Sequence, residues 1–144
     1  LFRSAVEKNA GLTYDEDDVE RALEGDVIQF CAFLPPEDEH IVTDAATGVL
    51  TTRWCDYFCD VVPANSSKPA GIRATLERYG IAPEDSIAFG DGGNDASMLR
   101  MCGIGVAMGN ASPDAIAAAD YVTDDVDHDG IARALDHFAG LWRR

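Results

Sequence analysis

The chain has 144 residues, 47% of them hydrophobic, which is enough for one domain or for parts of two. Acidic residues outnumber basic ones by 26 to 11, and the net charge of −15 disfavours binding to nucleic acid or to an anionic membrane surface. An anionic substrate stays compatible with this charge if a metal ion or a few well-placed Lys and Arg residues neutralise it locally.

The cysteines and the absence of targeting signals bear on the compartment. Four cysteines are present, and no His/Cys cluster completes a zinc site, so we expect small buried thiols: Cys31, Cys55, Cys59 and Cys102. No stretch resembles a signal peptide, and no apolar run approaches membrane-spanning length. A reducing cytoplasm is therefore the expected compartment, with no membrane partner.

The N-terminal part of the chain mixes helix and strand signals. Residues 1–24 are polar and predict a helix, and residues 26–34 predict a strand that ends at a Pro-Pro pair. Residues 41–62 predict further strands around the turn signal DAATG. The polar run ANSS (residues 64–67) marks a domain boundary.

The remainder alternates regularly between helix and strand signals. The expected helices cover residues 68–80, 94–103, 112–119 and 129–138, and the expected strands residues 86–90, 104–109 and 120–123. This alternation is typical of an α/β fold, in which helices cover both faces of a parallel sheet. Ligands of such sheets bind beyond the carboxyl ends of the strands.

The run FGDGGNDASML (residues 89–99) places two acids at such an end. Asp91 follows the expected buried strand, two glycines permit a tight turn, and Asn94 and Asp95 begin the next helix. Oxygen ligands in this arrangement suit a hard cation such as Mg²⁺. The alternative is that Asn94 or Asp95 only caps the helix.

Two further segments are expected at the same edge. Lys68 begins the helix that leads into the strand before Asp91, where it could reach a phosphoryl group; alternatively, it is a solvated surface lysine. The loop MGNAS (residues 108–112) offers backbone N–H groups and the Asn110 amide, or is a simple turn with a helix cap. Their convergence on one edge predicts a site.

Three runs carry a resemblance to a known family: KPAGI (residues 68–72), FGDGGNDASML (89–99) and GVAMGNA (105–111). They resemble the C-terminal motifs of the haloacid dehalogenase superfamily, over residues 60–138. VAMGNA and the ending DYVT…DGI (120–131) are similar to its Cof-type branch, sugar-phosphate phosphatases with an α/β cap domain. The resemblance implies that residues 1–63 are the C-terminal part of a cap. Residues 64–144 would be half of a three-layer Rossmann-like core.

The resemblance also implies roles for individual residues. Lys68 would hold the phosphoryl group and the nucleophile, Asp91 would bind Mg²⁺, and Asp95 would bind the metal or orient its shell. Asn94 would contact phosphate or the aspartates, and Asn110 is a phosphate candidate at the rim. A small phosphorylated metabolite is the implied substrate class.

The nucleophile of that family is missing. It is the first aspartate of a D-x-D motif after an N-terminal strand, and the only similar letters, DEDD (residues 15–18), predict a helix start instead. We therefore expect the C-terminal part of a longer phosphate-monoester hydrolase that acts through an aspartyl-phosphate. The chain alone should be inactive. Its strand 86–90 should expose an apolar edge and favour dimerisation or association with the missing half.

Other functions remain open on the sequence. A catalytically inactive domain of the same fold would bind a phosphorylated ligand or a protein partner, and the missing nucleophile favours it. The phosphorylation domain of a P-type ATPase has a similar GDGxND motif, but the VAMGNA run disfavours it, and a receiver domain fits less well. The substrate itself is not readable, although Arg53, Trp54 and Tyr57 could line a pocket in the cap.

Overall fold

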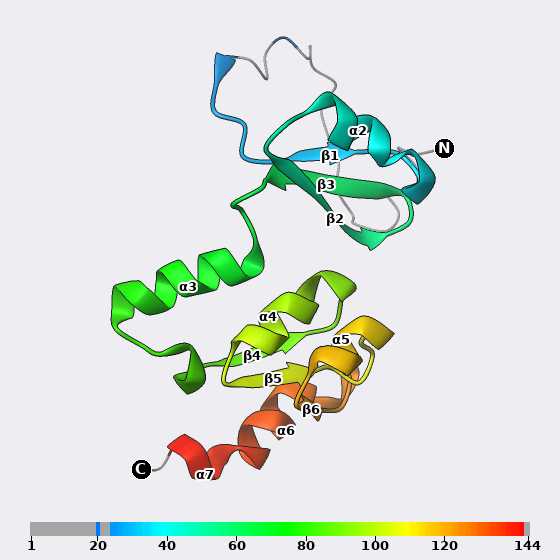
Figure 1. The fold of residues 1–144 in the computed structure, drawn as a ribbon. Coiled ribbons are helices and arrows are strands. Elements are labelled where there is room, and N and C mark those ends of the chain that lie inside the picture. The colour runs from blue at the N-terminus through cyan, green and yellow to red at the C-terminus, as the bar shows by residue number, and fades with distance from the viewer. Residues whose placement is uncertain (1–19, 21–23, 143–144) are drawn as a thin grey trace. The chain divides into compact units, whose positions relative to one another are not determined.

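The computed structural model describes residue 20 and residues 24–142, apart from the side chains of Trp54 and Trp142. The chain divides into two compact units, with the boundary between Ala64 and Asn65 (Figure 1). The helix expected in residues 1–24, including the DEDD run, lies almost wholly outside the described residues. The α/β fold is confirmed, because one unit holds a parallel sheet packed by helices and the other a small antiparallel sheet.

The described residues of the first unit form three strands and one α-helix: β1 (Phe30–Ala32), α2 (His40–Ala45), β2 (Val49–Cys55) and β3 (Phe58–Pro63). A 3₁₀ turn, η2 (Pro36–Asp38), precedes the helix. The strands are antiparallel in the order β1-β3-β2, with Cys31 opposite Asp60 and Thr51 opposite Val61. Val61 and Cys59 are buried on the central strand.

Two expectations for this unit were wrong in detail. The strand expected over residues 26–34 is confined to Phe30–Ala32, and a helix occupies His40–Ala45 where a strand was expected. The apolar pair Ile41-Val42 is too short to distinguish a strand from a helix. Acidic residues just before it favour a helix start, because they complement the positive N-terminal end of the helix dipole.

A polar cluster links the start of α2 to β2. The Glu39 carboxylate accepts hydrogen bonds from the Thr51 hydroxyl and from Arg53 Nε, the latter at 2.5 Å, and Arg53 Nη2 donates to the Leu34 carbonyl at 3.0 Å. The hydrogen bond from Thr51, followed by that from Arg53, lowers the pKa of Glu39. Arg53 is thus engaged inside its own unit, whereas Tyr57 is 51% exposed.

The thiols differ from the expectation at two positions. All four cysteines are free, and Cys59 and Cys102 are buried as expected, but Cys55 is only partly buried and Cys31 is exposed. It lies on the edge strand β1, where its thiol is 3.2 Å from an oxygen of Asp60. Within the described part of the chain, no helix is long and apolar enough to cross a bilayer.

The second unit follows the predicted alternation. Its strands are β4 (Ile87–Gly90), β5 (Ile104–Ala107) and β6 (Tyr121–Val122). Its helices are α3 (Lys68–Tyr79), α4 (Ala96–Met101), α5 (Pro113–Ala118), α6 (Gly130–His137) and α7 (Ala139–Trp142), with 3₁₀ turns η3 (Pro83–Asp85), η4 (Gly93–Asp95) and η5 (Val126–His128). The sheet is parallel in the order β4-β5-β6.

Local signals set the helix ends of this unit. The Ser67 hydroxyl accepts from the Ala70 N–H at 3.2 Å at the start of α3, and Gly80 ends that helix in the left-handed conformation at φ 66°. The Ser112 hydroxyl likewise accepts from the Ala115 N–H at the start of α5. The expected helix 94–103 is shorter, because its first turn is the 3₁₀ turn η4.

The core of this unit lies between the sheet and helices α4 and α5. Leu99 is completely buried against Ala88, Cys102 and Ala115. A Cβ on Gly105 would lie 2.4 Å from the Leu99 carbonyl oxygen, so β5 can approach α4 this closely only with glycine at that position. Helices α4 and α5 cover one face of the sheet, and α6 lies on the other (Figure 1).

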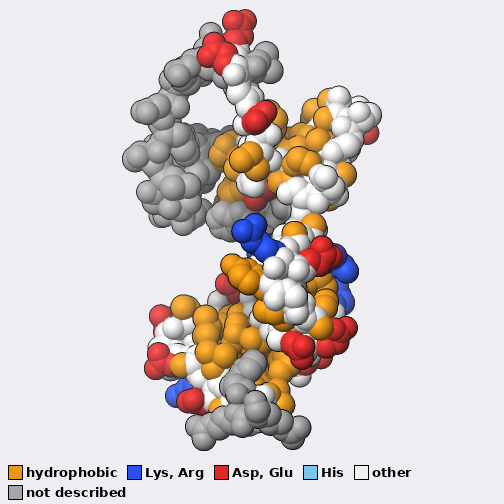
Figure 2. Space-filling model, turned by 90° about the vertical axis from the view of Figure 1, so that its left-hand side faces the viewer, with side chains coloured by type: hydrophobic (Ala, Val, Ile, Leu, Met, Phe, Trp, Pro, Cys, Tyr) orange, Lys and Arg blue, Asp and Glu red, His pale blue; other side chains and the backbone are white. Residues whose placement is uncertain are grey.

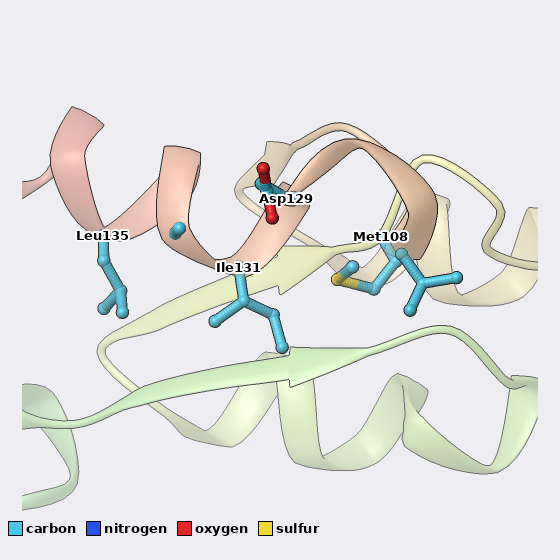
Figure 3. Close-up of a pocket in the computed structure, with 7 residues that line it drawn as sticks. Met108, Asp129, Ile131 and Leu135 are labelled. Atoms are coloured by element: carbon cyan, nitrogen blue, oxygen red, sulfur yellow. The ribbon is translucent and has the colours of Figure 1, made fainter.

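Each outer strand of the sheet, β4 and β6, has one edge without a neighbour among the described strands. β4 pairs with β5 alone, which leaves its second edge free. Beside α6 lies an apolar hollow of about 370 Å³, into which Ile131 and Leu135 project (Figure 3). These side chains are 49% and 39% exposed, and hydrophobic atoms are visible on the surface of this unit between acidic ones (Figure 2).

Candidate functional site

The carboxyl ends of β4 and β5 form the edge at which the candidate residues meet. Asp91 directly follows β4 and is exposed. The Met108 N–H donates to the Gly90 carbonyl at 3.0 Å, and the Ser112 N–H donates to the Asp91 carbonyl at 2.7 Å. These two hydrogen bonds join the Asp91 turn to the loop after β5, so the two loops lie side by side at the carboxyl edge of the sheet.

The glycines of the turn make room for side chains rather than supplying a left-handed backbone. Gly92 has φ −95°, which any residue can adopt, but a Cβ there would lie 2.5 Å from Asn94 Oδ1. A Cβ on Gly90 would lie 2.6 Å from Asp95 Cβ. The turn therefore folds around the side chains of Asn94 and Asp95, and Gly90 is a residue that the sequence did not single out.

Asp95 is the buried acid of the site. Its carboxylate accepts hydrogen bonds from the N–H groups of Asp91 and Gly92, both at 3.0 Å, and pairs with the Lys68 ammonium. Burial by itself would raise the pKa of Asp95. The hydrogen bonds from Lys68 and from the two N–H groups outweigh burial and lower that pKa, so Asp95 is held as a carboxylate. It makes no capping hydrogen bond to α4.

Lys68 reaches this acid from the first position of α3. Its side chain is 48% exposed, so the ammonium contacts Asp95 on one side and keeps an accessible surface on the other. Lys68 is therefore not a purely solvated surface lysine, which was the alternative left open by the sequence. Lys68 is one of only two lysines in the sequence, the other being Lys8.

The two asparagines take different places. Asn110 is exposed in the loop after β5, and its Nδ2 lies 3.5 Å from Asp91 Oδ2, at the outer limit of a hydrogen bond. Asn94 is half-buried inside the turn, with its amide oxygen against Gly92. The structure thus brings Asn110 beside Asp91, while the side chain of Asn94 packs inside the turn.

The donor set is compatible with a hard cation that keeps most of its waters. Within residues 20 and 24–142, no group of three or more His, Cys, Asp and Glu side chains is arranged to hold a metal ion. Mg²⁺ commonly binds through one or two carboxylates and retains several waters, which is what an exposed Asp91 beside a second acid can offer. Asp91 is the acid with accessible oxygens.

Comparison with known proteins gives one family over most of the chain. Residues 7–135 match the family of haloacid dehalogenase-like hydrolases. The 5-amino-6-(5-phospho-D-ribitylamino)uracil phosphatase YcsE of Bacillus subtilis is 40% identical over 72 residues, which are 50% of this chain and 29% of that protein.

Two solved structures are similar over nearly all of the chain. The sugar phosphatase BT4131, of haloacid dehalogenase subclass IIB, superposes with a TM-score of 0.85 at 39% identity over 94% of this chain and 54% of its own. The phosphatase BT1666 of Bacteroides thetaiotaomicron superposes with a TM-score of 0.86 at 36% identity, over 96% and 52% of the two chains. The chain therefore spans about half the length of these structures.

Proposed function

The chain belongs to the haloacid dehalogenase-like hydrolases, and we propose that the whole protein hydrolyses a phosphate monoester of a small molecule such as a sugar phosphate. Its relatives include sugar and small-molecule phosphatases. The observation that carries the proposal is the pairing of Lys68 with Asp95, and of Asn110 with Asp91, in the turn at the carboxyl edge of a parallel sheet. In this proposal residues 1–63 belong to a cap and residues 64–144 to the catalytic core, in a protein of the cytoplasm.

The residues present would bind the phosphoryl group and stabilise the negative charge that develops on it. Lys68 would hold a phosphoryl oxygen through its accessible side, and Asn110 would donate to the phosphate at the rim, with Asn94 supporting the turn. Mg²⁺ is the proposed cofactor, held at the turn that carries Asp91 and Asp95, and when bound it would neutralise developing negative charge. The nucleophilic aspartate that would form the aspartyl-phosphate is not among these 144 residues.

We expect the 144-residue chain alone to release no phosphate from p-nitrophenyl phosphate in the presence of Mg²⁺, because it lacks a nucleophile for the first step. Phosphate release measured over several hours checks this. Turnover that disappears in Asp91→Ala would contradict the expectation and show that the chain carries a complete site.

The missing nucleophile also supports a second candidate, a catalytically inactive domain that binds a phosphorylated ligand or a protein. The coding sequence upstream of residue 1 separates the two. An apolar strand followed by D-x-D-G-T there supports the hydrolase, and an open reading frame without it supports the binding domain.

We propose that the free edge of β4 is covered by another polypeptide, either a second copy or the missing half of the fold. An unpaired strand edge and the exposed side chains of Ile131 and Leu135 both favour association. Light scattering of the 144-residue chain should therefore give a mass above the 15.5 kDa of a monomer. A stable, monodisperse monomer would count against this proposal.

A further inference from the structure

Thr123 is one of two buried polar side chains among the described residues, the other being Asp95, and no step of the proposed reaction uses it. It is 7% exposed and directly follows β6, at the carboxyl edge of the sheet. Its hydroxyl donates a hydrogen bond to the Gly130 carbonyl, at the start of α6, at 2.7 Å. Burying a hydroxyl costs free energy unless it is hydrogen-bonded, so this contact indicates what Thr123 does.

The contact closes the loop between β6 and α6. Thr123 and Gly130 are the two ends of the loop formed by residues 124–129, and the Gly130 N–H also donates to the Asp125 carbonyl at 3.1 Å. Among the described residues, Asp129 is the one residue other than glycine with a positive φ, at 56°. Such a backbone conformation persists only where its surroundings impose it, so the Thr123 contact helps to hold a loop that would otherwise relax.

The closed loop supports the loop after β5. The Gly109 N–H donates to the Asp124 carbonyl at 3.1 Å. A Cβ on Gly109 would lie 2.7 Å from the Asp125 nitrogen, and a Cβ on Gly130 would lie 2.0 Å from the Asp124 carbonyl oxygen. The peptide group that joins Asp124 to Asp125 is therefore packed between two glycines, with no room for a side chain at either. A shift of this peptide group would displace Gly109 with it.

Gly109 immediately precedes Asn110, a candidate residue of the site. Asn110 Nδ2 lies 3.5 Å from Asp91 Oδ2, and a contact at this outer limit of a hydrogen bond tolerates little displacement. The Met108 and Ser112 N–H groups join this loop to the Asp91 turn on the side of β4. The Gly109 hydrogen bond supports it from the side of β6, so the position of Asn110 depends on both neighbouring loops.

A second link between the closed loop and α6 is an ion pair on the surface. Asp124 Oδ2 lies 3.1 Å from Arg133 Nη1, and the two side chains are 51% and 64% exposed. Exposed ion pairs contribute little to stability and are screened by salt. The buried hydroxyl of Thr123 is therefore the contact that we expect to hold the loop.

We propose that Thr123 is a positioning residue for phosphate binding: its hydroxyl holds the loop after β6, and this loop keeps Asn110 beside Asp91. The inference rests on the proposed function, in which Asn110 donates to the phosphate. It extends the candidate site to the end of a third strand, β6. Thr123 acts through Asn110 and is itself too buried to contact a ligand of that loop.

NMR relaxation of the backbone amide nitrogens in the unaltered 144-residue chain tests the first part of the proposal. Gly109 and Asn110 should have order parameters near about 0.85, the value of a rigid backbone, whereas values below about 0.6 indicate a flexible one. Flexible values would overturn the proposal, since the loop after β6 would not be holding these residues. This measurement needs no variant, so it decides even if a substitution prevents folding.

Thr123→Val tests the hydroxyl itself, because valine keeps the shape of the side chain. The order parameters of Gly109 and Asn110 should fall below about 0.6, and Thr123→Ser, which keeps a hydroxyl, should restore them. The matched control is Thr75→Val on α3, where the hydroxyl donates to the Gly71 carbonyl at 2.9 Å. This control should leave Gly109 and Asn110 rigid. Rigid values in Thr123→Val would overturn the proposal.

Steady-state kinetics of a whole phosphatase that contains this chain test the second part. Thr123→Val should raise the KM for p-nitrophenyl phosphate about three- to tenfold, as expected for one lost hydrogen bond, and leave kcat within about twofold. A purely structural role would instead reduce the amount of folded enzyme, and with it the apparent kcat, at unchanged KM. In an Asn110→Ala background, Thr123→Val should raise KM no further, because it acts through Asn110.

The outcomes separate this proposal from the proposed function. If Asn110→Ala leaves KM unchanged, the phosphate role of Asn110 in the proposed function is wrong, and the relaxation measurements decide alone whether Thr123 holds the loop. If Asn110→Ala raises KM and Thr123→Val does not, or if the two effects add, the positioning role of Thr123 is wrong and the proposed function stands.

Discussion

Replacing Asp91 with asparagine in a whole phosphatase that contains this chain is expected to lower turnover at least about a thousandfold. A bound metal ion stabilises the transition state by several kcal/mol, and each 1.36 kcal/mol corresponds to a factor of about ten in rate. Asparagine keeps the size of the side chain and removes the charge. Steady-state hydrolysis of a phosphate monoester at saturating Mg²⁺ measures the effect.

The control for that experiment is Asp85→Asn. Asp85 is an exposed acid in η3, before β4 and away from its carboxyl end, and the substitution changes the net charge by the same amount. It should leave turnover within about twofold, since surface substitutions have small effects. An Asp91→Asn enzyme that retains more than about a tenth of the activity would show that this carboxylate does not supply the metal site.

Leu99→Ala is expected to reduce the free energy of unfolding of the second unit by about 2–5 kcal/mol. Leu99 is completely buried in the middle of α4, between Ala88, Cys102 and Ala115, and its removal leaves a cavity that the short helix cannot close. Hydrogen exchange of the β5 amides reports on this unit specifically, because β5 lies at the centre of its sheet.

The matched control is Leu141→Ala, the same substitution on α7, where the side chain is 56% exposed. It should change the free energy of unfolding by less than about 0.5 kcal/mol. If hydrogen exchange of the β5 amides is equally fast in both variants, burial of Leu99 in the core does not stabilise this unit more than the exposed Leu141 does.

The elements of the second unit were readable from the sequence because each is marked by neighbouring residues. Ser67 and Gly80 delimit α3, and Ser112 followed by a proline begins α5. Such signals act over three or four residues, so they can be recognised without knowledge of the tertiary structure. The same holds for the order of strands and helices, from which the parallel sheet and the edge that carries Asp91 follow.

The first unit was less readable, because its signals are short and ambiguous. The Ile41-Val42 pair fits a strand or a helix, and the choice depends on packing: α2 contacts β2, to which Glu39 is hydrogen-bonded. β1 is confined to the three residues that pair with β3, although the apolar pattern around it is longer. Pairing partners, not the propensity of the segment, set these boundaries.

The sequence by itself determined the fold class, the family resemblance and the segments that meet at the carboxyl edge of the sheet. Only the tertiary structure decided how the two acids differ. Lys68 and Asp95 are 27 residues apart, and their contact exists only when α3 and the turn after β4 have packed together. Burial of Asp95 and exposure of Asp91 likewise depend on neighbours far away in the chain, and no local pattern of residues encodes them.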